Sequence, residues 1–132
     1  MKLSLVVLFT TFTLVSHAQI VIPTDAKKYM GDVVTVCGQV SSAQKSNDID
    51  LHPTLLGFGQ GFPNNNFSVV ILEEDLEGFN YNPVDLDNAN VCVTGMVVKI
   101  FGKPGIFVSD PSQIESSGEG ESNLTYHLDS GN

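Results

Sequence analysis

Short runs of Val, Ile, Leu and Thr, separated by clusters of Gly, Pro, Asn and Asp, dominate the pattern of apolar and polar positions along the chain. Runs of this kind are typical of strands, and the clusters between them are typical of turns. The pattern predicts five strands, at residues 32–42, 54–59, 67–72, 90–101 and 106–109. The segment GKPG at 102–105 is then the turn between the last two strands.

Two segments have the features of short helices instead. In PTDAKKYMG, at 23–31, Thr24 can cap the first turn, and Gly31 suits the left-handed position that follows the last turn. Between the third and fourth predicted strands, Leu76 and Phe79 are at helical spacing. We therefore expect a short N-terminal helix and a helical insertion between strands three and four.

Glycine interrupts two of the predicted strands, in the similar patterns VTVCGQV at 34–40 and VCVTGMV at 91–97. A glycine or a bulge allows a long strand to bend sharply, and a small closed barrel needs such corners. We interpret Gly38 and Gly95 as the corner residues of strands one and four. Five strands with a helical insertion after the third match an all-β, five-stranded Greek-key barrel, the OB fold.

The N-terminus has the pattern of a secretory signal peptide. Lys2 precedes an apolar run at 3–15, and the sequence SHA at 16–18 is a small-x-small cleavage signal. The run is too short and too rich in Thr for a transmembrane helix. We expect a signal peptide at 1–18, cleavage near Ala18, export to the periplasm or the extracellular space, and no membrane insertion.

The C-terminal segment at 115–132 is rich in Ser, Gly and Glu, so we expect a disordered tail there and a folded domain at 19–114. The chain has fifteen carboxylates, six lysines and no arginine, which gives a net charge of −9. Loss of Lys2 with the signal peptide makes the charge −10, and leaving out the four carboxylates of the tail makes it about −6 for the domain. Such a charge repels polyanions and favours solubility.

The chain has two cysteines, Cys37 and Cys92, which lie close in sequence to Gly38 and Gly95. Strands one and four are neighbours in an OB barrel, so the two cysteines can meet if they share a face. An oxidising location and an even number of cysteines favour a disulfide, and two buried free thiols are the alternative. The pattern leaves both open, because strand register cannot be fixed from it.

Catalytic and metal-binding patterns are missing or incomplete. The sequence has no nucleophile elbow, no phosphate loop and no Ser/His/Asp arrangement, and its cysteines and histidines lack the spacing of zinc ligands. The pairs Asp48/Asp50 and Asp85/Asp87 lack the glycine and distal Glu of a calcium loop, so we interpret them as solvated loop residues. We therefore expect no enzymatic activity, no cofactor and no metal.

Three segments resemble the OB-fold domains of the tRNA-anticodon-binding-like group, namely GDVVTVCGQV, FPNNNFSVVI and NVCVTGMVVKIFGKPGIFVSDPSQI. The resemblance covers residues 26–114, and the end of the third segment is its most specific part. This group includes short exported bacterial proteins and domains fused to secreted nucleases. The resemblance implies an OB barrel and, by association, nucleic-acid binding without catalysis by this domain.

OB folds generally bind their ligand on the face of strands two and three, between flanking loops. Here this surface would include Phe58, Phe62, Lys99, Phe101 and Lys103. Aromatic platforms and nearby cations are how OB barrels stack and track single strands. We interpret these five residues as the candidate ligand-binding set.

Two functions remain after the charge is considered. Phosphate contacts dominate nucleic-acid affinity and each needs a nearby cation, but the domain offers few lysines. Most phenylalanines are expected in the core rather than on a binding surface. This applies above all to Phe67 and Phe107, which lie in apolar runs. The first function is weak binding of single-stranded nucleic acid. The second is an acidic interaction domain of the cell envelope that binds a protein or a glycan.

Overall fold

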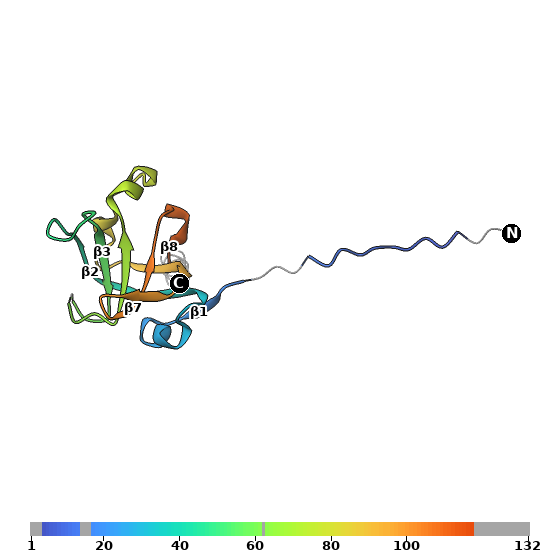
Figure 1. Cartoon of the computed structure of the whole chain (residues 1–132), viewed down its shortest axis with the longest axis horizontal. Coiled ribbons are helices and arrows are strands. Elements are labelled where there is room, and N and C mark those ends of the chain that lie inside the picture. The colour runs from blue at the N-terminus through green and yellow to red at the C-terminus, as the bar shows by residue number, and fades with distance from the viewer. Residues whose placement is uncertain (1–3, 14–16, 62, 118–132) are drawn as a thin grey trace, which may run out of the picture.

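The computed structural model describes residues 4–13, 17–61 and 63–117, and these residues form a mostly β fold with short 3₁₀ helices (Figure 1). The strands are β1 (Gln19–Val21), β2 (Val33–Lys45), β3 (Thr54–Phe58), β4 (Phe67–Ile71), β5 (Asn90–Met96), β6 (Val98–Ile100), β7 (Lys103–Phe107) and β8 (Ile114–Ser116). The helices are η1 (Pro23–Tyr29), η2 (Glu73–Gly78), η3 (Pro83–Leu86) and η4 (Pro111–Gln113).

The eight strands form one sheet in the order β6-β7-β4-β3-β2-β5-β8, with β1 paired to β2. The first half of β2 pairs with β5 and the second half pairs with β3, both antiparallel, whereas β4 and β7 are parallel. The hydrogen-bonded path is open, with β6 and β8 at its two ends, and the chain connects β5 to β6 through Val97. This arrangement is consistent with an OB-like barrel, but it has eight strands rather than the expected five.

The difference in strand number has identifiable causes. The strand predicted at 90–101 is divided at Val97, because β5 pairs with β2 as far as Met96 whereas β6 pairs with β7. The other two additions, β1 and β8, have three residues each, too few for a period-2 pattern to be recognised. The last predicted strand begins earlier than expected, at Lys103, since Ile100 already pairs with Lys103 across a two-residue turn.

Both predicted helical segments are present, as 3₁₀ helices. The first begins at Pro23 with Ile22 as its N-cap, so the prediction that Thr24 is the cap is wrong. Proline at the first helical position has a backbone already set for a helix, which explains the earlier start. Gly31 has φ 86°, the left-handed conformation that was predicted after this helix. The insertion between β4 and β5 consists of η2 and η3.

The core lies where alternate side chains of the strands point inward. Its largest fully buried side chains include Leu56, Phe58, Phe67, Ile71, Ile106 and several valines of β2, β4 and β5. Phe67 is buried as predicted, but Phe107 is 51 % exposed, so its predicted place in the core is wrong. The reason is the period of two, because Ile106 and Val108 on either side of Phe107 take the inward positions.

Gly38 and Gly95 lie where β2 and β5 change partners, each within two residues of the change. A Cβ atom on Gly38 would lie 2.8 Å from Cγ of Pro23, and one on Gly95 would lie 2.5 Å from Cγ2 of Ile106. These positions therefore need glycine for close packing against η1 and β7, in addition to the bend that the sequence indicated.

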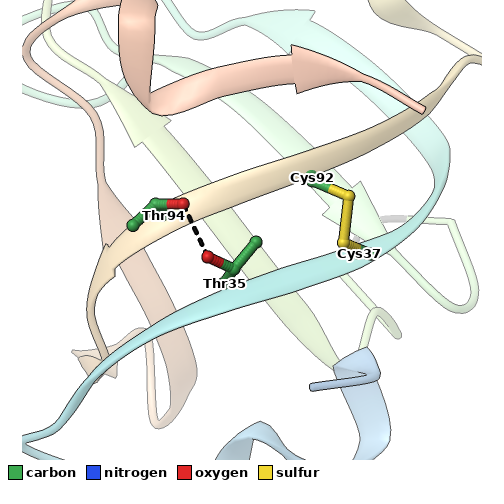
Figure 2. Close-up of a disulfide and its surroundings, with 4 residues drawn as sticks. All are labelled: Thr35, Cys37, Cys92 and Thr94. Atoms are coloured by element: carbon green, nitrogen blue, oxygen red, sulfur yellow. Dashed lines mark hydrogen bonds between the residues drawn. A yellow bond between two sulfur atoms is a disulfide. The ribbon is translucent and has the colours of Figure 1, made fainter. Parts of the chain in front are cut away.

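A disulfide joins Cys37 of β2 to Cys92 of β5, as Figure 2 shows. The two residues are directly opposite each other in the antiparallel register, with their Cα atoms 4.0 Å apart. On the same face, the hydroxyl oxygens of Thr35 and Thr94 form a hydrogen bond of 2.7 Å. The prediction of a cross-strand bridge is confirmed, and the alternative of two free thiols is excluded.

The N-terminal end of the described chain has no secondary structure, whereas a strand lies near its C-terminal end. Residues 4–13 form no helix or strand, and Figure 1 shows them as an extended segment leading away from the sheet. No helix in the described part of the chain is long and apolar enough to cross a membrane. At the other end, β8 continues two residues past the predicted domain boundary at Ile114. Residues 118–132 of the expected tail lie outside the described residues.

Candidate ligand-binding site

The face of β3 and β4 that was expected to bind ligand is covered. Every residue of both strands is buried. Phe58 has an exposed fraction of 0 % and packs edge to face on Phe67, so its predicted position on a ligand surface is wrong. On the opposite side of these strands, Leu55 and Val70 form a second apolar cluster with Ile100 of β6.

The β6–β7 hairpin is the exposed part of the predicted ligand-binding set. Its two-residue turn consists of Phe101 and Gly102, with φ 49° and 79°. The side chain of Phe101 is 56 % exposed, Lys99 is exposed on β6, and Lys103 is half-buried at the start of β7. Phe62, also predicted in this set, lies outside the described residues.

The backbone of Phe101 is unusual for a phenylalanine. Two consecutive positive φ values are typical of a type I′ turn, whose first position favours Asn, Asp or Gly. A bulky residue with a positive φ is uncommon and costs conformational energy. The hairpin thus places an aromatic side chain at its exposed tip, at a position whose backbone conformation favours Asn, Asp or Gly.

The lysines of the described chain fall into two groups. Lys28 forms an ion pair with Asp25 at 3.4 Å, and Lys45 forms one with Glu73 at 3.0 Å. The hydrogen bond and positive charge of Lys45 lower the pKa of the Glu73 carboxyl, which therefore stays ionised beside it. Both of these lysines are therefore already paired with a carboxylate.

The remaining described lysines, Lys27, Lys99 and Lys103, form no ion pair with a carboxylate of the described residues. Lys103 donates a hydrogen bond to the backbone carbonyl of Pro63, which leaves two of its three ammonium donors. Lys27 and Lys103 line a common cavity of about 360 Å³. Lys99 lies opposite Pro104, which also lines this cavity.

We call the group Lys27, Lys99, Phe101 and Lys103 the lysine end of the molecule. It is built from η1 and the β6–β7 hairpin, and the β3–β4 loop lies beside it, since Asn64, Asn65 and Asn66 line the same cavity. The structure thus brings together three of the five predicted ligand-binding residues. Lys27 was not predicted.

The β3–β4 loop is held down by Asn65. Its Nδ2 donates to the backbone oxygen of Phe67 at 3.0 Å and to Oγ of Ser68 at 2.6 Å. Gly57 makes room for it, because a Cβ atom on Gly57 would lie 3.3 Å from Cβ of Asn65. Asn65 is 2 % exposed, and its Oδ1 has no hydrogen-bond partner among the described residues.

Carboxylates gather at the opposite end. The strand β4 begins after the β3–β4 loop and ends immediately before η2, so the lysine end and η2 lie at opposite ends of the same strand. The acidic side chains there are Glu73, Glu74, Asp75 and Glu77, and the β2–β3 loop at that end adds Asp48 and Asp50. Figure 1 shows this separation, with η1 in blue at the bottom and η2 in yellow-green at the top. The net negative charge is therefore unevenly distributed.

Lys27 could have been found from the sequence. An acidic residue three positions before Lys28 can pair with it along a helical turn, and this residue is Asp25. The positions three and four residues from Lys27 hold Thr24, Pro23, Met30 and Gly31, so no local carboxylate can pair with it. Among the described residues, His, Cys, Asp and Glu side chains form no group of three that could hold a metal ion.

No family model matches the chain, and no curated protein matches it. Among solved structures, yeast Stn1 and Ten1 are similar with a TM-score of 0.56 and 11 % identity, covering 88 % of this chain and 71 % of that chain. A putative aspartyl-tRNA synthetase from Leishmania major Friedlin has a TM-score of 0.46 and 15 % identity, covering 86 % of this chain and 23 % of that chain. The OBody AM1L10 bound to hen egg-white lysozyme has a TM-score of 0.41 and 19 % identity, covering 70 % of this chain and 84 % of that chain.

At these identities the similarity concerns the fold. The chain spans less than a quarter of the length of the synthetase. The match to Stn1 and Ten1 has the highest TM-score of the three, 0.56. Together with the mostly β architecture, this match supports an OB-like fold for the chain.

Proposed function

We propose that the protein is a non-catalytic OB-fold module that binds single-stranded nucleic acid weakly through its lysine end. In this proposal β5 and β6 act as one strand of a five-stranded Greek-key barrel, and β1 and β8 are additions to it. The observation that supports binding at this end is the position of Lys27, Lys99 and Lys103. They are the lysines without a carboxylate partner in the described chain. Lys27 and Lys103 line one cavity, and Lys99 lies on the same hairpin as the exposed Phe101.

The arrangement suits a single strand for two physical reasons. Lysines without a carboxylate partner can neutralise backbone phosphates, and the acidic residues of η2 are held at the far end of β4. An exposed aromatic ring offers a stacking surface that every base can use. With only three cations available, and with a net charge of −9 on the chain, the affinity should be low.

A fluorescence-anisotropy titration of the protein into a labelled single-stranded oligonucleotide tests this proposal. We expect saturable binding at about 20 mM salt, where screening is weak. Raising the salt concentration should weaken binding. A plot of log affinity against log salt concentration should have a slope near −2, since three phosphates contribute about 0.7 each. An anisotropy that stays flat at high protein concentration and low salt contradicts the proposal.

We also propose that the protein is exported after cleavage between Ala18 and Gln19. The Cys37–Cys92 disulfide suits an oxidising compartment, and β1 begins at Gln19, directly after the proposed cleavage point. The apolar side chains at 5–9 are exposed and contribute nothing to the core, as suits a segment that is removed. Mass spectrometry of the native protein should give a chain that starts at Gln19, and a mature chain that keeps residues 4–13 would rule this out.

A second candidate function is the docking of an envelope protein on the outer face of β1, β2 and β5. The observation that favours it is the exposure of the apolar side chains of Ile20, Val33 and Met96 on this face. A partner bound there should be lost in Met96→Glu and kept in Lys103→Gln. The opposite response of the two variants would exclude this face.

A further inference from the structure

The cavity at the lysine end has a lining that is unusual for so acidic a chain. It lies between η1, the β3–β4 loop and the start of β7, and its volume is about 360 Å³. No carboxylate of the described residues lines it, although the whole sequence has fifteen carboxylates. The lining residues are Pro23, Thr24, Lys27, Asn64, Asn65, Asn66, Lys103 and Pro104. Ammonium, amide and hydroxyl groups supply hydrogen-bond donors, so the cavity favours an anionic occupant.

Two cations reach this cavity from different elements. Lys27 comes from η1 and has no ion pair with a described carboxylate, whereas the adjacent Lys28 is bound to Asp25. Lys103 comes from β7, and its contact with the carbonyl of Pro63 fixes the ammonium group while leaving donors for a ligand. Two positive charges attract an anion with two negative charges more strongly than an anion with one.

Asn65 is a buried polar side chain in the wall of the cavity, and its Oδ1 has no partner among the described residues. Only 2 % of the residue is exposed. The assignment of its amide atoms is secure, because Nδ2 must face the carbonyl of Phe67, which can only accept. Buried acceptors nearly always have a donor, so the unpaired Oδ1 is consistent with a donor from outside the described residues.

We propose that the cavity binds a terminal phosphate monoester, the phosphorylated end of the single strand whose binding is proposed above. A monoester carries a charge of about −1.5 to −2 at neutral pH, and its second pKa is near 6. Lys27 and Lys103 favour its dianion, whose three free oxygens can accept hydrogen bonds from both ammonium groups. An internal phosphodiester has one charge and two free oxygens, so a pair of lysines distinguishes a strand end from the middle of a strand.

The proposal is tested with three oligonucleotides of one sequence and one internal fluorophore. The first has two hydroxyl ends, the second a 5′-phosphate and the third a 3′-phosphate. We expect one of the phosphorylated strands to bind about tenfold more tightly than the hydroxyl strand, because hydrogen bonds to charged groups are strong. Inorganic phosphate should compete for that gain and leave the remaining affinity unchanged.

Lys27→Gln and Lys28→Gln are matched variants, because both remove one charge from exposed positions of the same helix. Lys27→Gln should abolish the preference for the phosphorylated end, and Lys28→Gln should keep it. Circular dichroism and thermal unfolding confirm that both variants fold.

The possible results distinguish a terminal-phosphate site from single-strand binding in general. Equal binding of all three oligonucleotides, or an equal effect of the two variants, overturns the terminal-phosphate site and leaves the single-strand binding proposal intact. If no oligonucleotide binds, the strand-end proposal fails together with the proposed function. Binding of inorganic phosphate by calorimetry, lost in Lys27→Gln, would in that case identify the cavity as a site for free phosphate.

Discussion

Phe101 has a backbone conformation that its residue type disfavours. With φ 49° it takes the first position of a type I′ turn, next to Gly102 at φ 79°. Its ring is nevertheless exposed at the hairpin tip rather than buried in the core. Strain of this kind is retained in proteins where the side chain has a function, which is consistent with a stacking role for Phe101.

The first prediction at this scale concerns Phe101→Asn. Asparagine adopts the left-handed conformation readily, so we expect the free energy of unfolding to rise by up to about 1 kcal/mol in chemical denaturation. The same variant loses base stacking, so its affinity for a single strand should fall by about 1–3 kcal/mol in an anisotropy titration. Lower stability together with unchanged affinity would contradict both parts of this interpretation.

Single residues also mark the limit of what the sequence reveals about the site. Lys99, Phe101 and Lys103 could be placed together because they belong to one hairpin. Phe58 could not be assigned correctly, because the period of two shows which residues share a face but not which face points into the core. Asn65 and Ile100 cover β3 and β4, and this follows from tertiary packing.

At the scale of elements, the disulfide joins the two strands whose glycines suggested a barrel. Cys37 and Cys92 are 55 residues apart in sequence, so the bridge encloses β3, β4 and both helices of the insertion. A cross-link over a loop of this length restricts the unfolded chain strongly. The fold should therefore depend on the oxidised state.

The second prediction is the loss of stability on reduction. In the chain-entropy account, a loop of 55 residues corresponds to about 4 kcal/mol. Urea unfolding with and without reductant measures the difference, and thiol titration of the unreduced, denatured protein should find no free thiol. A Cys37→Ser/Cys92→Ser variant is the control and should resemble the reduced protein. Equal stability of all three forms would disprove a structural role for the bridge.

The pattern of elements was more accessible from sequence than their ends. β2, β3 and β4 follow runs of apolar residues, and the β2–β5 pairing was expected because strands one and four are neighbours in an OB barrel. The division of β5 from β6 at Val97 was not accessible, because the side-chain pattern continues through it while the hydrogen-bond partner changes. The short strands β1 and β8 exist only through pairing with neighbours that are distant in sequence.

At the scale of the whole molecule, the net charge is less informative than the distribution of the charge. A chain with a charge of −9 suggests poor binding to a polyanion. The fold, however, separates the carboxylates of η2 from Lys27, Lys99 and Lys103 by the length of β4. Such separation gives a locally favourable surface, and it cannot be read from composition because it depends on which loops share an end of the sheet.

The most direct test compares two double variants that change the net charge equally. Lys99→Gln/Lys103→Gln removes charges from the lysine end, and Lys28→Gln/Lys45→Gln removes lysines already paired with carboxylates. Anisotropy titrations across salt concentrations should give the first variant a slope near −0.7 and the second the wild-type slope near −2. Equal slopes for the two variants would mean that net charge alone governs binding and would contradict a binding surface at the lysine end.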